Sequence, residues 1–276
     1  MKRARVLLPA LDVAVALVLA GCAATASPPA GLVLHKPVVL LGEVHDNATQ
    51  HALRLRAFEA LLATGARPAL LMEQFDRQHQ GEIDRLLAQR PRPDADTFIA
   101  AVTAPRDGWN WAHYKPFVAL ALRTGLPIVA ANVGREEARG VMRQGLAASG
   151  FDAAVPADIE AGTVADVLAS HCGLIDDGMA RRMAQAQFAR DQFMARAIEQ
   201  YADRGLVLLA GNGHVRIDRG VPRWLSPGTR ARSEAIGLLE AGSSNARDFD
   251  RVVYTERQER PDPCAGMQKP SLLAPP

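Results

Sequence analysis

The chain has 276 residues, of which 48% are hydrophobic and 22% are charged, and its formal net charge is +2. A chain of this size and composition can bury a sizeable core, and one domain is the simplest expectation. The basic residues are dispersed among acidic ones rather than clustered as phosphate binding requires, so nucleic acid is not an expected partner.

Residues 1–22 are expected to be a lipoprotein signal peptide. A basic start, MKRAR, precedes an apolar stretch that is short for a transmembrane helix, and Leu-Ala-Gly-Cys closes the segment at Cys22. These residues resemble a lipobox, in which the cysteine is lipidated and anchors the mature protein to a membrane. The alternative is a plain secretory signal with an incidental Cys22. Ala23 after the cysteine favours the outer membrane, facing the periplasm, and residues 23–36 are typical of a flexible tether.

Four apolar segments predict the buried strands of one sheet. Their hydrophobicity is continuous, which is typical of strands covered on both faces by helices. The segments are PVVLL (37–41), PALLM (68–72), PIVAA (127–131) and LVLLA (206–210). The intervening segments have helical periodicity, and Asn47 is the expected N-cap of a helix over 48–65. The sequence predicts an α/β fold with a central, mostly parallel sheet in one domain over 37–256, with a helical insertion around 76–125.

Extended structure is also expected late in the chain. HVRIDRGVPRWL (214–225) resembles a strand and a turn, and ARDFDRVVYTE (246–256) alternates as a strand does, so a mixed sheet is expected. With Cys22 acylated, Cys172 and Cys264 remain and are expected to pair in an oxidising compartment, which would pin the tail, residues 257–276. Two independent thiols are the alternative.

Polar side chains follow each of the four apolar segments. Glu43 and His45 follow the first, Glu73 the second, Asn132 the third and His214 the fourth. In open α/β sheets, ligands bind at the carboxyl ends of the strands. Buried carboxylates need a compensating cation, proton or ligand, so these residues predict one shared site.

Two carboxylates and two imidazoles are compatible with metal chemistry. Glu43, His45, Glu73 and His214 could hold a divalent metal such as Mn, Zn or Co, or serve as catalytic residues of a hydrolase. Without a metal, a glutamate beside a histidine can act as an acid/base pair in ester or amide hydrolysis. No Gly-x-Ser-x-Gly motif occurs, so a serine nucleophile is not indicated.

Six segments in order resemble the ChaN group of bacterial haem-binding lipoproteins. They are LLGEVHDNATQHALRL, LLMEQFDR, WNWAHYKPFVALA, IVAANVGR, QAQFARDQFMARAI and LAGNGHVRIDRGVP, and they span residues 37 to about 225. The group is similar to TIKI proteins and erythromycin esterases, which share two Gly-x-x-His motifs and paired glutamates. By motif, Glu43, His45, Glu73 and His214 take the signature positions.

The resemblance implies a lipoprotein that binds haem at a dimer interface, with iron held by tyrosine and histidine, and that serves iron acquisition. His45 and His214 are the candidate histidines, and Tyr114 is the first-choice tyrosine, although a role in core packing fits it equally. Asn132 and Arg135 would complete the pocket, Arg135 through a haem propionate or another carboxylate.

For three residues on predicted helices, the sequence does not decide between a role at the site and a position on the surface. His51 is expected to face solvent rather than flank the site. Gln187 and Asp191, four residues apart, either support the site from behind or form an exposed polar stripe. Haem capture and metal-dependent hydrolysis therefore remain two hypotheses for the same set of motif residues.

Overall fold

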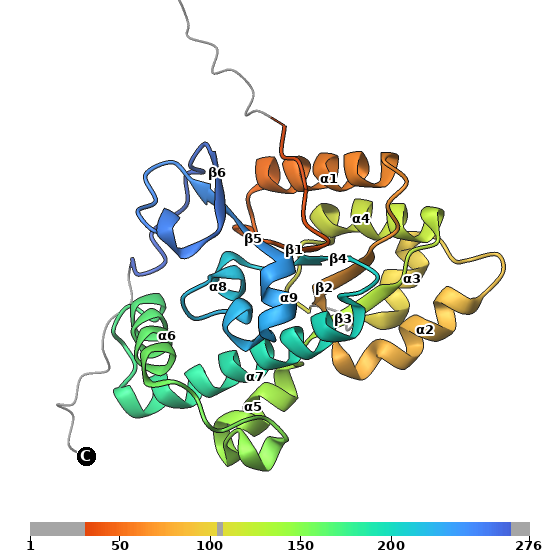
Figure 1. Cartoon of the computed structure of the whole chain (residues 1–276). Coiled ribbons are helices and arrows are strands. Elements are labelled where there is room, and N and C mark those ends of the chain that lie inside the picture. Colours follow the sequence, from red (N-terminus) through yellow and green to blue (C-terminus); the bar gives the residue numbers. More distant parts are fainter. Residues whose placement is uncertain (1–30, 104–106, 266–276) are drawn as a thin grey trace, which may run out of the picture.

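In the part of the chain that the structure describes, six strands form one sheet in the order β3-β2-β4-β1-β5-β6, with helices on both faces (Figure 1). This computed structural model describes residues 31–103 and 107–265. Cys22, the expected signal peptide and most of the expected tether lie outside the described residues. Within the described ranges, no helix combines the length and the apolar character needed to cross a membrane.

The elements alternate along most of the chain. The strands are β1 (Val38–Leu41), β2 (Ala69–Asp76), β3 (Ile128–Asn132), β4 (Leu206–Leu209), β5 (Ser233–Glu240) and β6 (Arg251–Thr255). The helices are α1 (Ala48–Ala63), α2 (Gln80–Ala88), α3 (Ala95–Val102), α4 (Trp111–Thr124), α5 (Arg135–Gln144), α6 (Ala157–Ser170), α7 (Asp177–Tyr201), α8 (Asn212–Val215) and α9 (Pro227–Arg232). Helices α2, α3 and α4 lie between β2 and β3, where the sequence predicts a helical insertion.

Every strand pairing among the described residues is parallel, which confirms the predicted α/β fold but not the antiparallel part of a mixed sheet. The segment 214–225 forms no strand: it contributes to α8 and to a 3-10 helix, Val221–Trp224. The reason is topological. Strand β4 is paired with both β2 and β1, so the chain that leaves it has no free edge to join. The segment 246–256 does supply a strand, β6.

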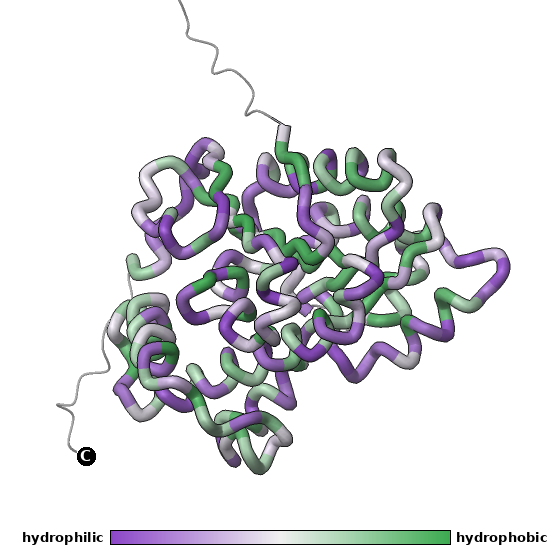
Figure 2. Tube along the Cα trace, in the orientation of Figure 1, coloured by the Kyte–Doolittle hydropathy of each residue, from purple (hydrophilic) through white to green (hydrophobic). Residues whose placement is uncertain are grey.

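Successive residues of the inner strands face opposite helical layers. In β1, Val39 and Leu41 pack with the apolar residues of α1 to α4, while Val38 and Leu40 pack with those of α7. Figure 2 shows the central strands as mostly apolar and many of the connecting loops as hydrophilic. Full burial of one such side chain contributes about 1.5–3 kcal/mol, so this sheet is a firm base for the polar residues at its edge.

A disulfide joins Cys172 to Cys264, as expected, across a sequence separation of 92 residues. Cys172 follows α6, and Cys264 lies beyond the last strand. The bond therefore ties the segment after β6 to the helical layer that contains α6 and α7.

Candidate ligand-binding site

The four motif residues meet at the carboxyl edge of β1, β2 and β4. Gly211, at the end of β4, marks their meeting point. Its N–H donates to Glu73 Oε2 at 2.7 Å. A Cβ atom placed on Gly211 would lie 2.9 Å from both Cε1 and Nε2 of His45, so the imidazole lies against the glycine backbone. Nε2 of His214 is 3.4 Å from Glu73 Oε1, and Nδ1 of His45 is 2.8 Å from Glu43 Oε1.

Glu43 is the centre of a buried polar cluster. Its Oε1 accepts hydrogen bonds from His45 Nδ1 and from the Tyr114 hydroxyl, and its Oε2 forms an ion pair with Arg54. Arg54 is fully buried, and this burial lowers its pKa to about 9, against the opposing effects of Tyr114 and Glu73. The guanidinium is therefore charged at neutral pH and compensates the buried carboxylate.

His51 is buried, with 4% of its surface exposed, so the expectation that it faces solvent is wrong. Its Nε2 donates to the carbonyl oxygen of His45 at 2.9 Å, and its ring stacks on that of His113 with centroids 4.3 Å apart. Burial lowers the pKa of His51 to about 4, so the ring is neutral at neutral pH. Its role in the structure is to hold the backbone of His45 in place.

His214 lies between two buried carboxylates. Its Nδ1 is 2.6 Å from Asp191 Oδ1 on α7, and its Nε2 faces Glu73. Burial acts to lower the pKa of His214, but Glu73 and Asp191 outweigh it and raise the pKa to about 10. Burial acts to raise the pKa of Glu73, but His214 and the Gly211 N–H lower it to about 2. Of Gln187 and Asp191, the two α7 residues whose roles the sequence left undecided, Asp191 contacts the motif residue His214.

We expect this arrangement to make stability depend on pH at both extremes. The pKa of His214 is about 10 instead of 6.5, so its contribution is complete below pH 6.5 and is lost as the pH rises through 10. The pKa of Glu73 is about 2 instead of 4.5, so its contribution is complete above pH 4.5 and is lost as the pH falls through 2. Urea unfolding at a series of pH values measures both losses.

Asp191→Asn is the matched variant for this pH dependence. It removes one of the two carboxylates that raise the pKa of His214, so the alkaline loss of stability should begin at a lower pH than in the parent protein. An unchanged alkaline profile would contradict the assignment of that loss to His214.

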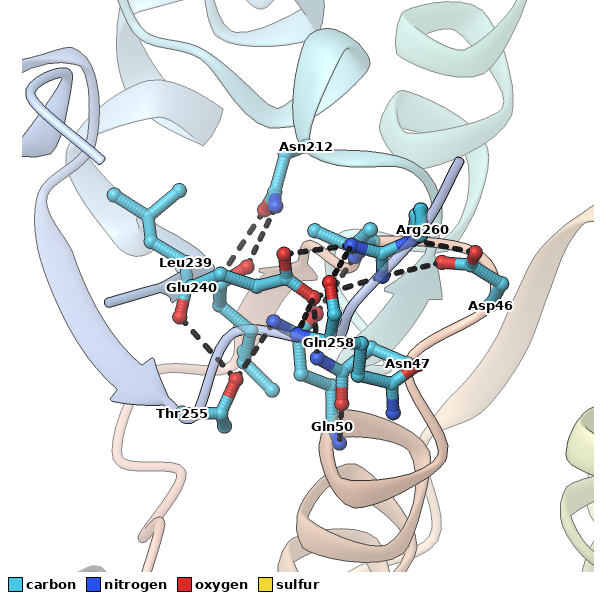
Figure 3. A network of polar contacts seen from close by, with 11 residues as sticks. Asp46, Asn47, Gln50, Asn212, Leu239, Glu240, Thr255, Gln258 and Arg260 are labelled. Carbon is cyan, nitrogen blue, oxygen red and sulfur yellow. Dashed lines mark hydrogen bonds and ion pairs between the residues drawn. The ribbon is translucent and has the colours of Figure 1, made fainter. Parts of the chain in front are cut away.

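The segment after β6, here called the C-terminal strap (residues 256–264), is bound to the loop that bears His45 (Figure 3). Arg260 donates to both oxygens of Asp46 at 2.6 and 2.7 Å and to both oxygens of Glu240 at 2.8 Å. Glu240 also accepts from Asn47 Nδ2 at 2.7 Å, and Asn47 caps α1 through the Gln50 N–H. The strap therefore supports the loop between β1 and α1.

Arg260→Ala is expected to loosen residues 43–47 while costing only about 1 kcal/mol of stability, because its ion pairs are partly solvent-exposed. Amide hydrogen exchange of the loop should become faster. Arg257→Ala is the matched control and should leave exchange unchanged, because Arg257 lies exposed in the same strap and forms no side-chain hydrogen bond or ion pair among the described residues. Equal exchange rates in the two variants would show that Arg260 does not position the loop.

Beside the motif residues lies a cavity of about 400 Å³, here called the cleft. Its wall includes the polar and aromatic residues Glu73, Gln74, Asp76, His79, Asp107, Trp109, Asn132, Arg135 and Arg190. His45 adjoins this wall, because its ring packs edge-on against Trp109 at 5.0 Å and its side chain is 51% exposed. The wall thus contains the predicted residues Asn132 and Arg135.

Two of the candidate iron ligands, Tyr114 and His214, are not presented to the cleft, and for Tyr114 the structure agrees with the alternative role in core packing. Tyr114 is fully buried and its hydroxyl is bonded to Glu43, so the structure places it in the core rather than on the cleft. Burial also raises the pKa of this hydroxyl, which disfavours the phenolate. Both ring nitrogens of His214 face carboxylates. Only His45 of these three presents an exposed imidazole, and its Nε2 has no hydrogen-bond partner among the described residues.

The residues of the site do not fit a Mn, Zn or Co centre, which was the alternative to haem. The described residues contain no group of three or more His, Cys, Asp and Glu side chains placed to hold a metal ion. Glu43 directs its oxygens at Arg54, Tyr114 and His45, and Glu73 directs its own at Gly211 and His214. The carboxylates are thus already engaged by protein groups rather than turned toward a common open position.

Sequence reasoning missed several residues of this region. Arg54, Gln74, His79 and Arg190 were not expected at the site. The one available signal was Arg54, an arginine at helical spacing among apolar residues of α1. A charged side chain on the buried face of a helix indicates a buried partner.

Comparison with known proteins agrees with this fold. ChaN of Campylobacter jejuni, solved with cofacial haem, matches with a TM-score of 0.66 and 19% identity over 79% of this chain and 86% of that chain. An erythromycin esterase variant in an open conformation matches with a TM-score of only 0.42 and 12% identity, over 75% of this chain and 71% of that chain. No curated protein matches the sequence.

The sequence itself matches a family model described as "Haem-binding uptake, Tiki superfamily, ChaN" over residues 32–225. That range contains all four motif residues and every strand from β1 to β4. The chain therefore belongs to the ChaN family of the Tiki superfamily.

Proposed function

We propose that this protein binds haem in the cleft, with His45 as an iron ligand, and serves iron acquisition. The observation that carries the proposal is the state of the His45 imidazole: Nδ1 is bonded to the buried Glu43 carboxylate, and the ring is half exposed beside the cleft. A histidine that donates its other N–H to a carboxylate is typical of metal ligation, because the carboxylate fixes the tautomer and raises the basicity of the ligating nitrogen. Family membership supports haem as the group that is bound.

The residues around His45 hold its imidazole in position. Arg54 and Tyr114 hold the Glu43 carboxylate, and His51 holds the backbone of His45. Trp109 packs against the imidazole at the cleft. Haem, when bound, supplies an iron centre with an open coordination position for this imidazole.

The geometry favours capture over the alternative, metal-dependent hydrolysis of peptides or esters. Glu43 and Glu73 are each bonded to protein donors, and the described residues contain no group of three or more His, Cys, Asp and Glu side chains placed to hold a metal ion. No observation in the described structure specifically supports turnover.

Titration of the chain from residue 23 with hemin tests the proposal. We expect a saturable shift of the Soret band with a fixed haem content per chain, recorded beside metal analysis and assays of peptide and ester hydrolysis. Non-saturable hemin uptake, with a stoichiometric divalent metal and hydrolysis, would overturn capture in favour of the enzyme.

We also propose that the protein is an outer membrane lipoprotein anchored through Cys22 and facing the periplasm, on the strength of the Leu-Ala-Gly-Cys sequence. Incorporation of labelled palmitate that is lost in Cys22→Ser would support it, and equal labelling of both proteins would refute it.

We also propose that the protein forms a homodimer, which is supported by family membership. Sedimentation with and without hemin tests that assembly.

A further inference from the structure

We propose that the wall of the cleft recognises carboxylate groups of its ligand through Arg135, Arg190 and the amide of Gln74. The inference rests on the proposed haem function and deepens it. It assigns this wall to the propionate side chains of haem, while the ring of haem lies toward His45 and Trp109.

The first observation is an unpartnered amide in the wall of the cleft. Gln74 is 4% exposed, and neither its amide nitrogen nor its amide oxygen has a hydrogen-bond partner. The Gln74 side chain is close enough to the Tyr114 hydroxyl to act on its pKa, which it lowers. That hydroxyl, however, donates its hydrogen bond to Glu43. Asn132, next in the wall, is 9% exposed and its Oδ1 is also unpartnered. Buried polar groups are normally satisfied, so these two amides indicate a polar ligand group at this place.

The second observation is the state of the two arginines. Arg135 begins α5 and Arg190 lies on α7, and both line the cleft. Within residues 31–103 and 107–265, neither guanidinium forms an ion pair or a side-chain hydrogen bond. Arg260, by contrast, is paired with two carboxylates. Two unpaired guanidinium groups at one cavity leave hydrogen-bond donors available to a ligand.

The acidic residues of the same wall have their partners within the protein. Glu73 accepts from the Gly211 N–H and faces His214. Asp76 accepts from Asn132 Nδ2 at 3.1 Å, and Asp107 accepts from the indole nitrogen of Trp111 at 2.8 Å. These carboxylates therefore have hydrogen-bond partners within the protein, whereas the two guanidinium groups have none among the described residues, although the charge of Arg190 acts to lower the pKa of Asp76.

A carboxylate is the group that complements this set. Its two oxygens fit the fork of a guanidinium and accept from an amide N–H as well. The propionates are the anionic side chains of haem, so a ring ligated by His45 would turn them toward Arg135, Arg190 and Gln74.

Hemin and its dimethyl ester, in which both propionates are neutral, separate this inference from the proposed function. The parent protein should bind hemin about 10- to 100-fold more tightly than the ester, as one or two charge-assisted hydrogen bonds would give. In Arg135→Gln/Arg190→Gln this preference should fall to about twofold or less, through weaker hemin binding at unchanged ester affinity. Gln74→Leu should reduce it in part.

Arg139→Gln is the matched control, because Arg139 lies on α5 but pairs with Glu136 on the exposed surface. It should keep the full preference for hemin. The single variants Arg135→Gln and Arg190→Gln are measured too, with far-UV circular dichroism to verify folding, so that the test survives if the double variant does not fold.

The outcomes are distinct. Equal affinity of the parent protein for hemin and ester, or a preference that survives in the double variant and in both single variants, overturns the carboxylate assignment and leaves haem binding standing. Failure of the parent protein to bind either compound overturns the proposed function itself.

Discussion

His45→Ala is expected to abolish specific hemin binding while the fold remains intact. Loss of an iron ligand should weaken binding by more than about 100-fold, since even the partners of a metal ligand change affinity by about 10- to 100-fold. Stability should fall by about 1–3 kcal/mol, because the buried Glu43 carboxylate loses one of its hydrogen-bond donors, although half of the His45 side chain is exposed. Soret titration and thermal unfolding of the same preparation measure the two quantities.

Two neighbouring glycines provide a steric control that leaves His45 in place. A Cβ atom on Gly211 would lie 2.9 Å from Nε2 of His45, whereas one on Gly213 would meet nothing within 4 Å. The φ angle of Gly211 is −62°, which alanine adopts readily. Gly211→Ala should therefore displace the imidazole and weaken hemin binding, and Gly213→Ala should not. If both His45→Ala and Gly211→Ala bind hemin tightly, His45 is not an iron ligand.

Arg54→Met is expected to destabilise the protein by about 3–5 kcal/mol, because it leaves the buried Glu43 carboxylate without its cation. For a domain of this size the melting temperature should fall by roughly 6–20 °C. Chemical unfolding measured by circular dichroism gives the free energy directly.

The double variant Glu43→Gln/Arg54→Met separates charge compensation from packing. It removes both charges at once, so it should be more stable than Arg54→Met alone, by a coupling free energy of about 0.5–3 kcal/mol. If the two single effects simply add, or if Arg54→Met costs less than about 1 kcal/mol, the ion pair does not have the role assigned to it.

The fold was largely predictable because its inner strands are continuous apolar runs. Segments 37–41, 68–72, 127–131 and 206–210 correspond to β1 to β4 within a residue or two, apart from the longer carboxyl end of β2. Strand β5 escaped prediction. Its apolar run is interrupted by Gly237, where a Cβ atom would lie 2.7 Å from the Phe249 ring, so this glycine is set by a packing contact.

The position of the site could be predicted from the sequence better than the roles of its residues. Strand ends marked Glu43, His45, Glu73 and His214, and these side chains do converge. Which nitrogen is accessible depends on partners from distant elements. Asp191 of α7 pairs with Nδ1 of His214, and the hydroxyl of Tyr114 of α4 is bonded to Glu43 in the core. Such long-range pairings leave no local pattern in the sequence.

The most direct measurement is a crystal structure of the hemin complex with anomalous diffraction collected at the iron edge. We expect an iron peak beside Nε2 of His45, next to Trp109, with Glu43 still bonded to Nδ1. An iron peak that is not in contact with the His45 imidazole would contradict this assignment.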